Sequence, residues 1–156
     1  MRLRMIAVGT RMSAWVDAAV ADYTRRVRGA NSLELLEVPV VRRNGSGDAE
    51  RAKRVEGERI LAQLSSREYA VALDERGRSM STLELSVWLA ARRQAGDPVC
   101  FIIGGPDGLD AAVWRRAQLR WSLSALTFPH ALVRVLVAEQ LYRAGSVLAG
   151  HPYHRE

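Results

Sequence analysis

The sequence contains one cysteine and no long hydrophobic run. A single cysteine excludes a disulfide framework, and Cys100 lies in the apolar stretch VCFIIGG, which indicates a buried packing residue in a reducing compartment. The first apolar stretch is interrupted by Arg11 before it reaches signal-peptide length, and no other stretch is long enough to cross a bilayer. We therefore expect a cytoplasmic protein that has no membrane partner.

The motifs of three large enzyme classes are missing. There is no Walker phosphate loop, no Gly-x-Gly-x-x-Gly dinucleotide motif and no Gly-x-Ser-x-Gly nucleophile elbow. Histidine is absent before position 130. His151 and His154 have a spacing that occurs in metal sites, but no second His or Cys cluster accompanies them, and Pro152 argues against a helix through the pair. We predict that the protein uses no metal.

Positive charge is present in excess, because the formal net charge is +6. This favours an anionic partner, with nucleic acid as the first candidate. Only Lys53 among the 23 basic residues is a lysine, a bias that a GC-rich genome also produces, so the inference depends on the excess charge alone. Arginine pairs occur at 25–26, 42–43, 92–93 and 115–116. Each pair is either a solvated face or a phosphate contact.

Apolar runs of strand length alternate with segments of helical period along all 156 residues. The expected strands cover 2–9, 32–38, 69–73, 99–105 and 118–126, and the expected helices cover 14–27, 57–64, 82–89, 108–117 and 131–144. The third helix is well marked, because Ser81 and Glu84 form a capping box and Met80 with Leu85 forms a hydrophobic staple. Three tryptophans of these elements are expected in the core: Trp88, Trp114 and Trp121. The pattern predicts a single α/β domain, residues 1–156, with a mostly parallel sheet flanked by helices.

Three stretches fall at the carboxyl ends of predicted strands: Leu73-Asp74, 104–108 and 123–128. Ligands of open parallel sheets bind beyond these ends, because the strand-to-helix loops gather there. Each stretch offers main-chain groups and small or hydroxyl side chains rather than charges, which suits an adenine ring and its ribose. Taken singly, each is also explained as a tight turn, an edge strand or a core residue. Their common position at one edge of the sheet favours a binding site.

Four stretches together resemble one family: AVGT at 7–10, IGGPDGL at 103–109, WSLSALTFPHALVRVLVAEQLYRA at 121–144 and HPYHRE at 151–156. Along its whole length the sequence resembles the ribosomal RNA large-subunit methyltransferase H family, a branch of the SPOUT methyltransferases. The resemblance implies a deep C-terminal trefoil knot, which general topology rules do not predict. It also implies S-adenosylmethionine as cofactor, a homodimer, and methylation of N3 of a pseudouridine in large-subunit (23S) ribosomal RNA on the assembled ribosome.

The family's cofactor positions coincide with the three strand ends. Carried over, they are Leu73, Gly104 with the adjacent Gly105, Leu123, Ser124, Ala125, Leu126, Thr127 and Phe128. Two positions depart from the family pattern: Gly145 replaces a bulky residue, and Ala131 replaces a proline. Both departures lie on the last predicted helix, so they bear on helix rigidity and dimer packing rather than on the reaction.

The last predicted helix is apolar on too many faces for a surface helix, so a dimer partner is expected to cover it. Its burial would anchor the tail across a cofactor pocket. We predict that Tyr153 stacks on or hydrogen-bonds the target base, that His154 assists proton removal, and that Arg155 holds phosphate or the base oxygen. Three further residues are substrate-binding candidates: His130, Arg134 and Arg143. His130 is alternatively a capping or packing residue, and Arg143 alternatively pairs with Glu139, four positions earlier.

Two other functions remain open at this point. One is ribose 2′-O methylation of RNA, which other knotted methyltransferases perform. The other is a non-catalytic ribosome-binding or assembly factor, in which the basic surface, including the loop RRNGSGD at 42–48, binds RNA without methyl transfer. The intact stretches IGGPDGL and SLSALTFPH argue against the second alternative.

Overall fold

The computed structural model describes residues 1–45 and 47–155. Within them the elements are β1 (Arg2–Val8), α1 (Ala14–Arg26), β2 (Ser32–Val38), α2 (Asp48–Gln63), β3 (Tyr69–Ser79), α3 (Thr82–Ala95), β4 (Val99–Ile103), α4 (Ala111–Arg116), β5 (Leu119–Ser122), α5 (His130–Leu148) and the 3-10 turn η1 (Pro152–Arg155). The strands pair in the order β2-β1-β4-β3-β5, and every pair is parallel. The predicted α/β class with a parallel sheet is confirmed. The knot stays a prediction of the resemblance.

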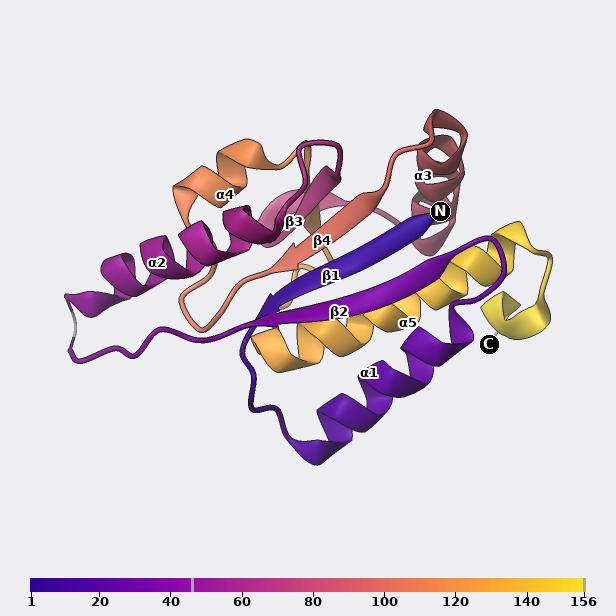
Figure 1. Cartoon of the computed structure of the whole chain (residues 1–156). Coiled ribbons are helices and arrows are strands. Elements are labelled where there is room, and N and C mark those ends of the chain that lie inside the picture. The colour runs from indigo at the N-terminus through magenta and orange to yellow at the C-terminus, as the bar shows by residue number, and fades with distance from the viewer. Residues whose placement is uncertain (46, 156) are drawn as a thin grey trace.

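The sheet separates two hydrophobic cores. Helices α1, α3 and α5 cover one face, and α2 and α4 cover the other (Figure 1). The central strand β4 is buried at all five positions: Phe101 and Ile103 face the first core, and Cys100 and Ile102 face the second. This confirms Cys100 as a packing residue, and burial raises the pKa of its thiol to about 12.

Side-chain capping hydrogen bonds form at the start of α3 but not at the start of α1. In α3, the Glu84 N–H donates to Ser81 Oγ at 3.1 Å, and the Ser81 N–H donates to Glu84 Oε2 at 2.7 Å, as a capping box requires. The helix ends at Gly96, whose φ of +75° lies in the left-handed region. Ser13 occupies the N-cap of α1, but its side chain makes no capping hydrogen bond.

The expected boundaries fail around α2, β3 and β5. α2 begins at Asp48, nine residues before the expected start at 57. β3 continues past Leu73 to Ser79, with a register shift against β5 between Leu73 and Arg78. Gly77 allows this approach, because a Cβ there would lie 2.6 Å from the Arg120 carbonyl carbon. β5 ends at Ser122, and its expected continuation is a loop. Ser124 explains the difference: its carbonyl accepts from Ser122 Oγ, and its own Oγ accepts from a following backbone N–H, each at 3.0 Å.

The tryptophan prediction holds for two of three positions. Trp121 is buried, and Trp88 packs edge-on against Phe101. Trp114 is partly exposed and lies outside both cores, so its prediction as a core residue is wrong. Its indole ring lies 5.1 Å from the Arg76 guanidinium and 4.0 Å from that of Arg120. At a boundary with water, an indole can pack its apolar ring against other side chains while its N–H makes a hydrogen bond. Helical periodicity does not distinguish such a boundary position from a core position.

The Gly145 position on α5 offers a test of helix rigidity. It lines a cavity of about 140 Å³ between α5 and the end of α1, and a Cβ there would lie 3.8 Å from Asn31 Nδ2, an ordinary contact. Gly145→Ala is expected to raise the free energy of unfolding by about 0.5–1 kcal/mol, because glycine is the poorer helix former. Guanidinium unfolding measures this change. The matched variant Gly150→Ala should instead destabilise, since φ is +68° there. A loss of stability in Gly145→Ala would contradict the helix-rigidity argument.

Candidate active site

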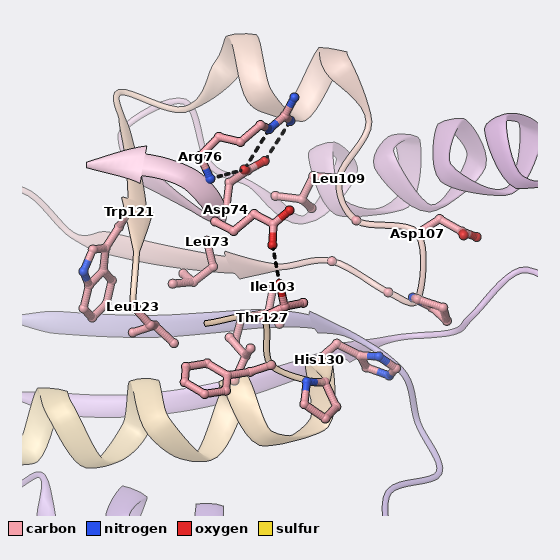
Figure 2. A pocket seen from close by; sticks show the side chains of 18 of the residues that line it. Leu73, Asp74, Arg76, Ile103, Asp107, Leu109, Trp121, Leu123, Thr127 and His130 are labelled. Atoms are coloured by element: carbon pink, nitrogen blue, oxygen red, sulfur yellow. Dashed lines mark hydrogen bonds and ion pairs between the residues drawn. The ribbon is translucent and has the colours of Figure 1, made fainter. Parts of the chain in front are cut away.

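A cavity of about 870 Å³ opens beside residues 73–76 of β3 and the carboxyl ends of β4 and β5, next to the first turn of α5 (Figure 2). The predicted cofactor residues that line it are Leu73, Gly104, Gly105, Leu123, Ser124, Leu126, Thr127 and Phe128. Ala125 lies outside the lining. The structure therefore brings the three predicted strand ends into one pocket, while their role in binding stays a prediction.

The loop after β4 forms one wall of the pocket from main-chain groups. Gly105 and Gly108 form an isolated antiparallel bridge, which folds the loop back on itself. A Cβ on Gly104 would lie 2.7 Å from the carbonyl carbon of Gly108, and Gly108 itself has φ of +84°. Only glycine permits this turn, because any larger residue would force the two sides apart. The glycines of IGGPDGL thus leave peptide groups accessible at the pocket wall.

The opposite wall is largely apolar. Leu73, Ile103 and Leu123 project from three different strand ends toward one space, as Figure 2 shows. Trp121 from β5 and Val133 from α5 extend this surface. A pocket that combines an apolar wall with main-chain donors and acceptors is suited to a flat heterocycle recognised through its edge.

Charged side chains also line the pocket, contrary to the expectation of uncharged strand ends. Asp74 accepts hydrogen bonds from the Arg76 backbone at 2.8 Å, from Arg76 Nη2 at 3.0 Å and from Trp114 Nε1 at 2.8 Å. Burial alone would raise the pKa of Asp74, but the hydrogen bonds from Arg76 and Trp114 outweigh it and hold that pKa below its usual value. The carboxylate is consequently ionised and fixed in place.

Glu75 connects two walls of the pocket. Its carboxylate Oε2 accepts a hydrogen bond from Thr127 Oγ1 at 2.9 Å, which joins β3 to the loop after β5 (Figure 2). Both side chains are exposed, so the contact is open to competition from water or a ligand.

His130 is the first residue of α5, and its side chain reaches the pocket. Burial lowers the pKa of its imidazole, and the positive charge of Arg134 lowers it further. The ring is consequently neutral at pH 7 and able to accept or donate a hydrogen bond. Its prediction as a substrate-binding residue is compatible with this position.

Arg134 does not face the pocket. Its side chain is 0% exposed, its Nη1 lies 2.8 Å from Glu37 Oε2, and its Nη2 donates to the Gly9 carbonyl at 3.2 Å. The prediction that Arg134 binds substrate is therefore wrong. Its guanidinium instead donates to carbonyls at the end of β1, which lies against this face of α5.

The C-terminal turn lies at the other end of α5 from the pocket (Figure 1). The ring of Tyr153 lies 4.6 Å from that of Tyr142, its hydroxyl lies 3.3 Å from Glu139 Oε1, and the guanidinium of Arg143 lies 4.7 Å from its centre. Burial, with further contributions from Tyr23 and Glu139, raises the pKa of the Tyr153 phenol. α5 has 19 residues, so it spans about 28 Å. The tail of a chain is thus remote from that chain's own pocket.

Arg143 belongs to the tail rather than to the pocket. Its Nε lies 2.7 Å from Glu139 Oε1, which confirms the predicted i,i+4 pair, and its Nη1 donates to the Tyr153 carbonyl at 3.3 Å. Its prediction as a substrate-binding residue depends on where the tail acts. His154 is partly buried and Arg155 is exposed, and neither lines the pocket.

Sequence reasoning missed several lining residues. Lys53, Glu75, Arg76 and Val133 were not singled out as candidates. Glu75 and Arg76 directly follow the predicted strand end, and Val133 lies one helical turn after His130, so adjacency was an available signal for these three. Lys53 comes from α2 on the other face of the sheet and had no local signal.

Two further searches cover only the described part of the chain. Residues 1–45 and 47–155 contain no cluster of three or more His, Cys, Asp or Glu side chains that could hold a metal ion. No helix among them has the length and apolar character needed to span a membrane.

Comparison of the sequence with known proteins identifies its family. The family model described as "Predicted SPOUT methyltransferase" matches residues 1–154. The ribosomal RNA large subunit methyltransferase H of Thioalkalivibrio sulfidiphilus is 52% identical over 156 residues, which is all of both chains. This chain belongs to that SPOUT methyltransferase family. The protein of the same name from Hahella chejuensis is 48% identical, also over the full length of both chains, which confirms the predicted membership.

Solved structures of more distant proteins share this fold. A probable methylase family protein from Haemophilus influenzae Rd KW20 aligns over 97% of this chain and 69% of its own, with a TM-score of 0.55 and 13% identity. A probable methyltransferase from Bordetella pertussis Tohama I aligns over 92% of both chains, with a TM-score of 0.50 and 20% identity. At these identities the likeness concerns the fold alone.

Proposed function

We propose that this SPOUT methyltransferase transfers a methyl group from S-adenosylmethionine to N3 of a pseudouridine in 23S ribosomal RNA on the assembled ribosome. One observation carries the proposal: the strand ends that match the family's cofactor positions meet in a single pocket with a main-chain wall. Full-length relatives that are about half identical are named ribosomal RNA large subunit methyltransferases, which supports the RNA substrate.

The pocket residues fit S-adenosylmethionine. The cavity volume of about 870 Å³ lies in the usual range for pockets that hold ligands of this size. The tight turn at Gly104 leaves peptide groups free to recognise an adenine edge, and Asp74 and Glu75 place carboxylates near a cationic ligand. Leu73, Gly104 and the loop 123–128 would hold the cofactor. When bound, it supplies an electrophilic methyl group on a sulfonium, and the donor chemistry needs no metal.

The side chains of the protein would align the acceptor with the methyl group and stabilise the charge that develops on the acceptor. In-line displacement requires the acceptor nitrogen to be held close to the methyl group and on its axis, which a rigid pocket at the end of a sheet can provide. N3–H of a pseudouridine is a weak acid at neutral pH, so a base or a nearby cation would assist its loss. We assign stacking on the base to Tyr153, assistance in proton removal to His154, and contact with phosphate or the base oxygen to Arg155.

A homodimer would bring these tail residues to a pocket. Apolar side chains along α5, including Leu132, Val135 and Leu136, are only partly buried in the single chain. A second copy would cover them. Because a tail lies at the far end of α5 from its own pocket, the tail of one subunit would close the pocket of the other. The α/β knot of the family would fix the pocket loops.

Exposed arginines would supply sequence-independent attraction to ribosomal RNA. Three of the four arginine pairs have one exposed member, and these are Arg42, Arg93 and Arg115. The neighbouring members have internal partners: Arg92 pairs with Asp97, for example, and Arg116 donates to the Ser65 carbonyl. Exposed cations that are scattered over several elements would attract phosphate without reading sequence, and ribosome shape would provide selectivity.

Two measurements test the proposal. Calorimetry should detect binding of S-adenosylmethionine, and mass mapping of ribosomal RNA from cells with and without the gene should locate a methyl group on the base of one pseudouridine. A methyl group on a ribose would support 2′-O methylation instead, and binding to ribosomes without any methyl difference would support an assembly factor.

The assembled ribosome as substrate gives a separate prediction. Intact ribosomes should be good acceptors in a transfer assay and stripped ribosomal RNA a poor one, because shape rather than sequence is recognised. Equal initial rates on the two acceptors would contradict it.

A further inference from the structure

A buried carboxylate lies behind the glycine loop of the pocket. Glu56 of α2 is 2% exposed, and a Cβ on Gly105 would lie 3.3 Å from its Oε1. Its Oε2 accepts the Val41 N–H at 2.9 Å and Arg43 Nη1 at 2.7 Å, while its Oε1 accepts Arg43 Nη2 at 3.0 Å. A buried charge requires such compensation, so Glu56 fixes both the backbone at Val41 and the guanidinium of Arg43.

Arg43 has every nitrogen engaged inside the protein. Besides the bidentate pair with Glu56, its Nη1 donates to the Val41 carbonyl at 2.6 Å and its Nε donates to Asp107 Oδ2 at 2.9 Å. The hydrogen bonds to Glu56 raise the pKa of the guanidinium above its usual value. Its neighbour Arg42 is exposed. The Arg42-Arg43 pair therefore divides into one arginine that is open to phosphate and one that is a structural link.

The link ends on the pocket. Asp107 belongs to the glycine loop, here Gly104–Leu109, which lines the pocket, and in Figure 2 its side chain points away from the apolar wall. Arg43 belongs to the basic segment, here 39–45, which follows β2. The side chain of Asp107 is 40% exposed and that of Arg43 is 19% exposed, so the contact joins a partly hydrated loop to a buried anchor.

We propose that Arg43 is a positioning residue that couples the basic segment to the glycine loop through Asp107. Cofactor in the pocket would steady the glycine loop, and through Arg43 the basic segment. RNA phosphate held by the exposed Arg42 would in turn tighten cofactor binding, because coupling between two binding sites is reciprocal. The identity of the two ligands rests on the proposed function.

The test uses the Val41 amide, whose hydrogen bond to Glu56 is buried. S-adenosylmethionine should slow hydrogen exchange at Val41 several-fold in the wild-type protein. In Asp107→Ala, which leaves the Arg43–Glu56 pair intact, the cofactor should slow exchange in 104–109 but no longer at Val41. The affinity of this variant for the cofactor, measured by calorimetry, should fall about three- to tenfold, since an unanchored loop must be ordered on binding.

Three further variants separate the coupling from general effects on charge and folding. Asp107→Asn keeps an oxygen acceptor for Arg43 Nε, so it should restore most of the Val41 response. Arg42→Ala removes the same charge as a change at Arg43 but no internal contact, so cofactor affinity and Val41 exchange should stay at wild-type values while affinity for ribosomal RNA falls. Arg43→Lys combined with Asp107→Ala should weaken cofactor binding less than the product of the two single effects.

The outcomes distinguish this coupling from the function on which it rests. If wild type and Asp107→Ala both bind the cofactor and show the same Val41 response, the coupling is overturned and the cofactor site is not. If the wild-type protein takes up no S-adenosylmethionine, the proposed function is overturned, and the coupling with it.

Discussion

Replacing His154 or Arg155 with alanine is expected to slow single-turnover methyl transfer to ribosomes by about 10²- to 10³-fold. The acceptor nitrogen must lose a proton during attack, and these side chains are the proposed base and cation at the tail. Both residues are assigned to the target nucleotide and not to the cofactor, so cofactor affinity should remain unchanged. The measurement is the rate with saturating enzyme, after calorimetry has shown equal affinity for S-adenosylmethionine.

A matched variant controls for lost electrostatic attraction. Arg115 is an exposed arginine on α4, so Arg115→Ala removes the same charge as Arg155→Ala without touching the tail. It should weaken ribosome binding slightly and leave the rate at saturation near wild type. Transfer by His154→Ala and Arg155→Ala at the wild-type rate would remove the tail from the chemistry.

Mixed dimers decide which subunit provides the tail. A chain carrying Arg155→Ala and a chain carrying Gly104→Val are each expected to be inactive as homodimers, the second because a side chain at Gly104 would collide with the Gly108 backbone. If the tail acts across the dimer, the mixed dimer contains one site with an intact pocket and an intact tail, and it should show about half the wild-type rate. An inactive mixed dimer would mean that each tail serves its own pocket.

The sequence predicted those elements that local interactions determine. Strands β1, β2 and β4 are short segments rich in apolar residues that are bounded by polar or glycine-rich turns, so their expected and observed ranges nearly coincide. α3 begins at its capping box as expected, but it continues to Ala95, six residues beyond the expected end at 89. The extension of β3 was not predictable, since it depends on Gly77 meeting the Arg120 backbone, a contact between distant segments. β5 was expected to be too long, because local hydrogen bonds of Ser124 compete with the ladder.

The same distinction applies to the candidate site. Parallel topology alone places the ends of β3, β4 and β5 at one edge, so the sequence order predicted that Leu73, Gly104 and Leu123 meet. In contrast, no local sequence pattern identifies the ion-pair partner of a charged residue when that partner lies far away in the sequence. Arg134 pairs with Glu37, which is 97 positions away on the edge strand β2, and Arg43 reaches Asp107 across 64 positions.

Among these long-range contacts, loss of those made by Arg134 should lower the free energy of unfolding most. Arg134→Met keeps an unbranched apolar chain, but it removes the partner of Glu37 and the guanidinium donor to the carbonyls of Val8 and Gly9. Breaking a buried pair costs about 3–5 kcal/mol, and because Glu37 is 33% exposed and can rehydrate, the loss should be about 3 kcal/mol. This is a large share of the roughly 5–15 kcal/mol that stabilises a typical domain. Guanidinium unfolding measures it.

An exposed ion pair that also involves β2 provides the control for this stability loss. Arg2 of β1 pairs with Glu34 of β2, with 3.2 Å between Arg2 Nη2 and Glu34 Oε2, but their side chains are 64% and 59% exposed. Arg2→Met should change stability by less than about 0.5 kcal/mol, since water replaces the lost partner. Adding Glu37→Met to Arg134→Met should recover part of the loss, because an apolar pair can replace a buried ion pair whereas an isolated charge cannot. A cost below about 1 kcal/mol for Arg134→Met would mean that water reaches Glu37 and the β1 carbonyls, and that α5 is held by its apolar contacts alone.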